Sequence, residues 1–353
     1  MMSARRLQKI RDNSPKRKRY SAVSHLESIV MGLLPTLDEI RRAQDLVYAL
    51  MQPTPQISWP LLNRRLGTEV WVKHENHTPI AAFKARTALV YAAEVFKHSP
   101  GIRGLITATR GNHGQSVALA GTRFGVPVSI VVPFGNSLEK NAAMRAQGAT
   151  LVEYGQDFQE AREYAGRLAL EQGWHFVPSY HRDIVKGVAS YWVELFSAQP
   201  ELDVVYVPIG MGSGICAACA ARNGMQLKTK IVGVVSEGAP AYALSFEAGK
   251  KVEAQVTTVI ADGMACRRPD DEPLEIIAQN VDHMVRVTDD EIREAMRIYF
   301  TDTHNVVEGA GAAALAAASR ERSALARKRV GLIVTGGNVD REVFAKVLLN
   351  GNC

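Results

Sequence analysis

One lysine of this 353-residue chain stands where a neutral amine could do chemistry. Lys84 follows Ala82 and Phe83 at the start of an apolar segment with helical spacing. Partial burial and a helix N-terminus both lower the pKa of a lysine. A neutral amine can form a Schiff base with an aldehyde cofactor and then move protons. By itself the segment is more typical of an ordinary surface lysine, so the neighbouring motifs must decide between the two.

A glycine-rich turn predicts a phosphate site. Gly210-Met-Gly-Ser-Gly214 follows a β-rich run and opens an alanine-rich helix. Glycines let backbone N–H groups turn toward an anion, and the helix dipole favours negative charge there. A dinucleotide-binding fold also has glycines at such a turn, but the third spaced glycine of that motif is missing here. The chain has no GxxxxGK[ST] segment either, which disfavours a nucleoside triphosphate.

Two further polar turns could meet an anionic ligand. Gly111-Asn-His-Gly114 offers backbone N–H groups and the Asn112 amide at a strand-to-helix turn. His113 is interpreted as a helix-capping residue, with a general base as the alternative. Thr335-Gly-Gly-Asn338 offers a small hydroxyl and flexible backbone at the end of a strand. Together, the lysine, the phosphate turn and the polar turns indicate a phosphorylated aldehyde cofactor.

These turns must be positioned by strands that alternate with helices. The predicted strands are 69–73, 104–108, 127–132, 150–154, 204–208, 230–235 and 330–335. Helical spacing predicts helices over 86–97, 111–124 and 139–147. This alternation is typical of a parallel sheet covered on both faces. Ligands bind beyond the carboxyl ends of such strands, and the three turns lie at those ends.

Length and charge limit the class of protein. The chain is long enough for two packed domains, and no apolar run reaches the roughly 18 residues of a membrane helix. Residues 1–20 hold eight Lys and Arg against one Asp, a balance of +7, while the whole chain carries +6, so the rest carries −1. The basicity is therefore a tail, interpreted as a disordered extension rather than a nucleic-acid contact.

Four scattered cysteines are too few for a disulfide framework and predict a reducing compartment. Cys216 and Cys219 have the spacing of a metal or redox pair. They lie inside a small-residue helix start, however, and no second pair follows. We therefore interpret both as structural residues.

The motifs together resemble the fold-type II pyridoxal-phosphate enzymes, in the threonine/serine dehydratase branch that includes serine racemase. Glu75-Asn76 followed by Ala82-Phe-Lys-Ala-Arg-Thr-Ala88 is similar to the family pattern E-N…S-F-K-x-R-G-A. Thr109-Arg-Gly-Asn-His-Gly114 resembles S-S-G-N-H-G, and Thr335-Gly-Gly-Asn338 resembles S-G-G-N. The resemblance covers about residues 35–350.

The resemblance implies a role for each matching residue. Lys84 takes the place of the Schiff-base lysine, Asn112 stands against the ring hydroxyl of the cofactor, and Thr335 faces the pyridine nitrogen. Glu308 matches a glutamate near the ring. The implied cofactor-binding residues are Phe83, Asn112, Gly210, Met211, Gly212, Ser213, Gly214, Glu308 and Thr335. The implied substrate-binding residues are Thr109, Arg110, Gly111 and His113.

The departures from the family pattern also carry information. Arg110 replaces the serine that acts as the opposite-face acid and base in the racemase, and a guanidinium is a poor base. Racemisation is therefore disfavoured. Arg110 could instead grip a second carboxylate of a hydroxyaspartate-like substrate, or turn outward. Val235 and Ala241 occupy the positions where family members bind a divalent cation, so no metal is expected.

The resemblance implies two interleaved three-layer αβα domains with mostly parallel sheets. We expect a basic extension at 1–30, a large cofactor-binding domain at 31–103 and 182–353, and a small domain at 104–181. The implied function is pyridoxal-phosphate-dependent β-elimination of a β-hydroxy α-amino acid, serine- or threonine-like, to a 2-oxo acid and ammonia.

Two alternatives remain at this stage: β-replacement or racemisation of a serine-like amino acid, and a non-catalytic binding protein with a nucleic-acid-contacting tail. The expected partners are a small amino-acid substrate and a second copy of the chain, without a membrane, in the cytoplasm.

Overall fold

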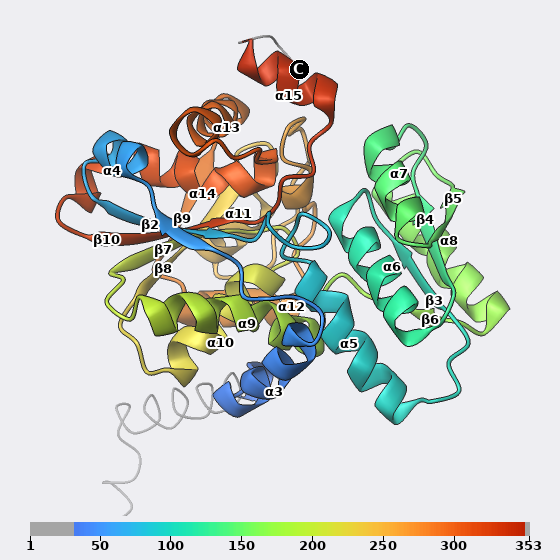
Figure 1. Ribbon diagram of the computed structural model, residues 1–353. Coiled ribbons are helices and arrows are strands. Elements are labelled where there is room, and N and C mark those ends of the chain that lie inside the picture. The colour runs from blue at the N-terminus through green and yellow to red at the C-terminus, as the bar shows by residue number, and fades with distance from the viewer. Residues whose placement is uncertain (1–31, 350–353) are drawn as a thin grey trace, which may run out of the picture.

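The computed structural model describes residues 32–349, which form two sheets with their covering helices side by side (Figure 1). The predicted basic extension at 1–30 lies outside the described residues. None of the helices in the described part is both long and apolar enough to cross a bilayer. The domain limits expected from the sequence stay a prediction.

The larger sheet has six strands and is parallel except at one edge. In spatial order its strands are Gln56–Ser58 (β1), Glu69–His74 (β2), Arg329–Val334 (β10), Val204–Pro208 (β7), Lys230–Ser236 (β8) and His283–Val287 (β9). Only β1 runs antiparallel to its neighbour, β2. The central strands are mostly apolar and buried, as expected for a sheet covered on both faces.

Helices cover both faces of this sheet. One face packs on Pro60–Leu66 (α4), Asp289–Thr303 (α13), Gly309–Arg320 (α14) and Arg341–Leu348 (α15). The other packs on Leu37–Tyr48 (α3), Ala85–His98 (α5), Arg182–Ala198 (α9), Ser213–Gly224 (α10), Ala241–Ala248 (α11) and Asp271–Asn280 (α12). Short 3₁₀ turns occupy Asp262–Met264 (η1) and Arg322–Leu325 (η2).

The smaller sheet has four parallel strands and is also covered on both faces. Its spatial order is Thr150–Glu153 (β5), Val128–Val132 (β4), Leu105–Ala108 (β3) and His175–Phe176 (β6). Asn112–Phe124 (α6) and Leu138–Ala146 (α7) cover one face, and Phe158–Gln172 (α8) covers the other. α5 packs between the two units, against α6 on one side and α9 on the other (Figure 1).

The predicted fold class is confirmed, and every predicted strand and helix lies within one residue of its observed limits. The strands β1, β6 and β9 were missed. β1 has three residues and β6 has two, too few for a periodic signal. β9 is an edge strand whose polar side chains alternate with buried valines.

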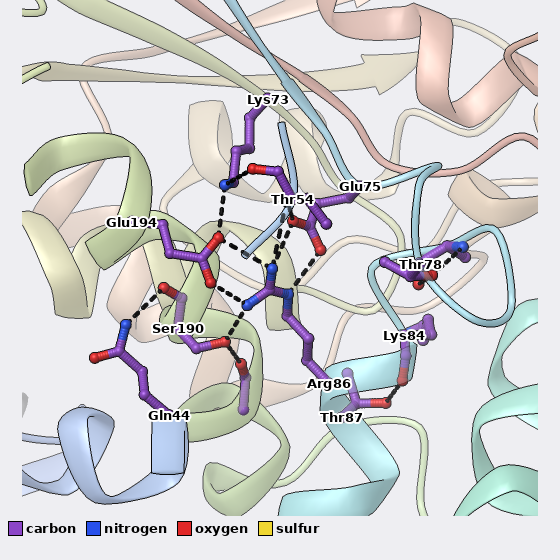
Figure 2. A network of polar contacts seen from close by, with 12 residues as sticks. Gln44, Thr54, Lys73, Glu75, Thr78, Lys84, Arg86, Thr87, Ser190 and Glu194 are labelled. Carbon is purple, nitrogen blue, oxygen red and sulfur yellow. Dashed lines mark hydrogen bonds and ion pairs between the residues drawn. The ribbon is translucent and has the colours of Figure 1, made fainter. Parts of the chain in front are cut away.

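A network of buried charges lies beneath the start of α5 (Figure 2). The guanidinium of Arg86 meets both oxygens of Glu75 at 2.8 and 3.0 Å and both oxygens of Glu194 at 2.6 and 3.1 Å. Lys73 Nζ lies 2.6 Å from Glu194 Oε2 and 2.7 Å from the carbonyl oxygen of Thr54. Two cations thus face two carboxylates, as charges removed from water require.

This network joins elements that are distant in sequence. It connects β2 through Lys73, the turn after β2 through Glu75, α5 through Arg86, and α9 through Glu194. Gly187 of α9 brings the helices close, since a Cβ there would lie 2.1 Å from the carbonyl oxygen of Arg86. The first turn of α5 is therefore held at a defined place.

We expect Glu194→Ala to lower the free energy of unfolding by about 3–5 kcal/mol, because Arg86 and Lys73 lose a carboxylate that they share in a buried site. Denaturant unfolding of the purified variant measures the loss. Glu294→Ala, which removes the exposed ion pair with Arg297, is the matched control and should change it by less than about 1 kcal/mol. Equal losses in both variants would contradict this account of the network.

Candidate active site

Lys84 is held at the first turn of α5 by its own carbonyl group. It is the N-cap residue of α5, and its carbonyl oxygen accepts hydrogen bonds from Thr87 Oγ1 at 2.8 Å and from Ser116 Oγ (Figure 2). Its Nζ lies 4.9 Å from the centre of the Phe83 ring. Desolvation lowers the pKa of Lys84 to about 8, against the opposing charge of Glu308. About a tenth of this amine is therefore neutral at pH 7, far more than at the ordinary lysine pKa of 10.5.

The segment before Lys84 is tied to the loop that follows β10. The Phe83 N–H donates to the carbonyl oxygen of Thr335 at 2.9 Å, and the Gly337 N–H donates to the carbonyl oxygen of Ala81 at 2.9 Å. Ala81 has a φ of 51°, a left-handed conformation that a residue with a Cβ seldom adopts. The lysine loop and the predicted Thr335 turn are thus adjacent.

Three polar side chains form a second chain of contacts. Asn112 Nδ2 donates to Glu308 Oε1 at 2.8 Å, and Asn338 Nδ2 lies 2.8 Å from Asn112 Oδ1. Burial raises the pKa of Glu308 to about 7, against the lowering effects of Lys140 and the Asn112 bond. A Cβ on Gly336 would lie 2.4 Å from Glu308 Oε1, so glycine is required where this carboxyl meets the loop. Asn112, Glu308 and the loop after β10 therefore meet in the structure.

The glycine turn after β7 has the form of an anion cradle. Gly212 has a φ of 96° and is the N-cap of α10, which lacks a side-chain cap. A Cβ on Gly210 would lie 2.1 Å from the carbonyl oxygen of Gly263. Tyr242 Oη donates to the carbonyl oxygen of Met211 at 3.2 Å and fixes the turn. The first N–H groups of α10, starting at Ser213, are thus free of a side-chain cap.

The loop after β3 leads into a second helix N-terminus without a side-chain cap. Gly111 is the N-cap of α6, and its N–H donates to Thr109 Oγ1 at 3.0 Å. A Cβ on Gly114 would lie 2.4 Å from Met144 Sδ, so the loop packs tightly on α7. The following N–H groups of α6 remain as donors for an anion.

The interpretation of His113 as a helix cap is wrong. The structure buries the ring, and neither ring nitrogen makes a hydrogen bond within the described residues. Burial, reinforced by the charge of Lys84, lowers the pKa of His113 to about 3. The N-cap of α6 is Gly111, two residues before His113. The buried imidazole of His113 is held neutral instead.

The other predicted residues fall into two groups. Thr335 is buried, and its carbonyl oxygen contacts the lysine segment. Arg110 is exposed, and within residues 32–349 its guanidinium has neither an ion pair nor a hydrogen bond. The structure thus brings the lysine segment against the Thr335 turn and Asn112 against Glu308, while Arg110 is exposed to solvent.

The sequence analysis missed three polar residues of this region. Asn338 ends the Thr335 turn but was not taken as a site residue; it bonds Asn112 and the carbonyl oxygen of Ile80. Lys140 and Asp262 form an ion pair of 2.8 Å from α7 to η1. Only Asn338 lay in a recognisable turn. The ion pair joins residues that carry no motif spacing, because they meet across the two units.

The described residues form no metal-binding cluster, and their cysteines are not paired. Within the described part of the chain no group of three or more His, Cys, Asp or Glu side chains could hold a metal. Cys216 and Cys219 are free and buried on α10, in agreement with a structural interpretation. Burial raises the pKa of the Cys219 thiol to about 12, which leaves it unreactive.

The arrangement fits a phosphorylated aldehyde. Gly210 and Gly212 at the start of α10 leave no room for a Cβ, and the helix end presents N–H donors, as a phosphate requires. Lys84 supplies a partly buried amine of lowered pKa, as an aldehyde requires. These features define the site of a pyridoxal-phosphate enzyme.

The chain belongs to the family of pyridoxal-phosphate dependent enzymes, whose sequence model matches residues 47–336. It is 31% identical to an L-threonine ammonia-lyase of Thermotoga maritima over 90% of this chain and 79% of the relative. It is also 31% identical to an L-threo-3-hydroxyaspartate ammonia-lyase of Saccharomyces cerevisiae over 90% of this chain and 97% of the relative. A crystal structure of a pyridoxal 5'-phosphate-dependent aspartate racemase superposes with a TM-score of 0.82 at 29% identity, over 87% of this chain and 97% of the other.

The raised pKa of Glu308 predicts a pH dependence of stability. The folded chain holds the proton up to a pKa of about 7, whereas the reference value is 4.5. The contribution of Glu308 to the free energy of unfolding should therefore fall as pH rises from 4.5 to 7, by up to about 3 kcal/mol. Glu308→Gln removes this dependence. Denaturant unfolding of both cofactor-free proteins at pH 5 and pH 7.5 measures the difference, and parallel changes would contradict it.

Proposed function

We propose that this enzyme catalyses β-elimination of a β-hydroxy α-amino acid, giving a 2-oxo acid and ammonia. The observation that carries the proposal is the position of Lys84. Its partly buried amine acts electrostatically on His113 in the first turn of α6 and on Glu308. Both α6 and α10 begin without a side-chain cap. Such a site accommodates a cofactor phosphate, a substrate carboxylate and a base between them.

Each group of this chain has a defined task in the proposal. The N-terminus of α10, with Gly210, Gly212 and Ser213, holds the phosphate. The N-terminus of α6 receives the substrate carboxylate. Asn112 stands against the ring of the cofactor and is oriented by Glu308 and Asn338. Thr335 provides a neutral hydroxyl for the ring nitrogen.

Bound pyridoxal phosphate supplies an electron-withdrawing ring that stabilises negative charge at the α-carbon of the substrate. Lys84 then removes the α-proton at Nζ, which requires a neutral amine and is favoured by its lowered pKa. The Cβ–O bond breaks and the hydroxyl leaves with a proton as water. Hydrolysis replaces the nitrogen by oxygen and releases ammonia. A neutral partner at Thr335 limits how far the ring withdraws electrons, which suits elimination.

The names of the relatives support this choice. Two of them are ammonia-lyases of β-hydroxy amino acids, one with a neutral side chain and one with a second carboxylate. The likeness to an aspartate racemase keeps racemisation as the second candidate. Arg110 disfavours racemisation, because a guanidinium stays protonated and cannot accept a proton on the face of the substrate opposite Lys84. β-Replacement would be distinguished by a new amino acid formed with an added thiol.

We further propose that the enzyme is a homodimer acting in the cytoplasm. The dimer rests on the resemblance to the family alone. The cytoplasm is supported by the free thiols of Cys216, Cys219 and Cys266, since an oxidising compartment selects for paired cysteines. A nucleic-acid function of the basic segment at 1–20 is not proposed; that segment lies outside the described residues.

We expect the purified protein to absorb in the visible range and to form 2-oxo acid from at least one of L-serine, L-threonine or L-threo-3-hydroxyaspartate. Lys84→Ala should abolish both the covalently bound cofactor and 2-oxo acid formation, because no amine remains to bind the aldehyde or to take the proton. Absorbance spectra and 2-oxo acid detection across the panel measure this. Unchanged turnover by the variant would overturn the assignment.

We expect the native enzyme to form D-serine from L-serine only at the background rate of the cofactor without protein, whereas Arg110→Ser should form it about tenfold or more above that background. The variant places a hydroxyl where the arginine now excludes opposite-face proton transfer. Chiral chromatography of reaction mixtures measures both products. D-Serine formed by the native enzyme as fast as 2-oxo acid would show that Arg110 does not decide the outcome.

A further inference from the structure

An ion pair joins the two units of the molecule beside the site. Lys140 Nζ on α7 lies 2.8 Å from Asp262 Oδ2 in η1. The two partners differ in their surroundings, since the side chain of Lys140 is 14% exposed and that of Asp262 is 47% exposed. The cation is therefore held inside, and the carboxylate reaches it from the solvent side.

The pair spans the loops that bind the two anions. The stem of Lys140 covers Gly111, where a Cβ would lie 3.0 Å from Lys140 Cδ. Asp262 precedes Gly263, whose carbonyl oxygen would lie 2.1 Å from a Cβ on Gly210 of the phosphate turn. Both charges act on Glu308: Lys140 lowers the pKa of that carboxyl and Asp262 raises it. The ammonium group thus lies beside the substrate loop and within electrostatic reach of the cofactor region.

Further contacts fix Lys140 but not Asp262. On the first turn of α7, Ser137 Oγ donates to Asp340 Oδ1 at 2.5 Å, and Glu139 Oε1 accepts from the Arg341 N–H at 3.1 Å. The turn that carries Lys140 is thus anchored to the large unit. Within residues 32–349 the carboxylate of Asp262 has Lys140 as its single hydrogen-bond partner. Asp262 is the partner that can be replaced.

We propose that the ammonium group of Lys140 binds an anionic β-substituent of the substrate. Until such a substituent displaces it, the Asp262 carboxylate pairs with this ammonium group. This inference rests on the proposed β-elimination and names its substrate class: β-hydroxy amino acids with a second carboxylate. One carboxylate then exchanges for another at the same ammonium, so no buried charge is left unpaired. A neutral side chain leaves the Lys140–Asp262 pair intact.

The test compares kcat/KM of the holoenzyme for L-threo-3-hydroxyaspartate and for L-threonine. Lys140→Gln should lower the ratio of the two values by about tenfold or more, because the dicarboxylic substrate loses its cation. Asp262→Asn should raise the ratio several-fold, because the competing anion is gone. Arg145→Gln, which removes one exposed charge from the same helix, is the matched control and should leave the ratio unchanged.

An unchanged ratio of the two kcat/KM values in Lys140→Gln would overturn the proposal. A ratio that falls only in Arg110→Gln would also overturn it, because Arg110 would then bind the second carboxylate of the substrate. Equal losses for both substrates would also overturn it, because they would indicate a structural role. If the native enzyme converts neither of these substrates nor L-serine, the proposed function fails. Calorimetric binding of succinate and butyrate then still tests Lys140: a tenfold weakening by Lys140→Gln confined to succinate supports the proposal, and equal weakening overturns it.

Discussion

The guanidinium of Arg86 is the constraint on which the site depends. It is fully buried, and its N–H groups donate to Glu75, which directly follows β2, and to Glu194 of α9. Lys73 completes the balance at Glu194. Charges taken from water tolerate little displacement, since a misplaced partner leaves the other unpaired. The network therefore holds the start of α5, and Lys84 is the N-cap residue of that helix.

The chemistry then follows from helix ends rather than from an unusual set of side chains. α6 and α10 begin at glycine N-caps without side-chain caps, so each presents N–H donors to an anion. The positive ends of two such helices lower the pKa of a nearby lysine. Desolvation also lowers the pKa of Lys84. Glu308, buried with a raised pKa, adds a carboxyl that can be neutral without an ionic partner.

Reaction chemistry and substrate selection occupy different parts of the fold. The amine, the glycine cradle and Thr335 belong to segments 81–84, 210–214 and 335–338 of the larger unit. Lys140 comes from α7 of the smaller unit and reaches the site through an ion pair across the two. A change at that junction can alter which side chain is accepted while the groups around Lys84 keep their positions.

The sequence by itself determined the fold class, the limits of seven strands and three helices, and the motifs that hold Lys84 and the glycine turns, because these depend on local spacing and on residue types with few uses. Only the tertiary structure decided the charge partners. Glu194 meets Arg86 108 residues earlier, Glu308 meets Asn112 196 residues earlier, and Lys140 meets Asp262 122 residues later. The state of His113 was also decided there, since burial rather than helix position controls its proton. Pairing and desolvation depend on which surfaces pack together, and local spacing carries no record of that.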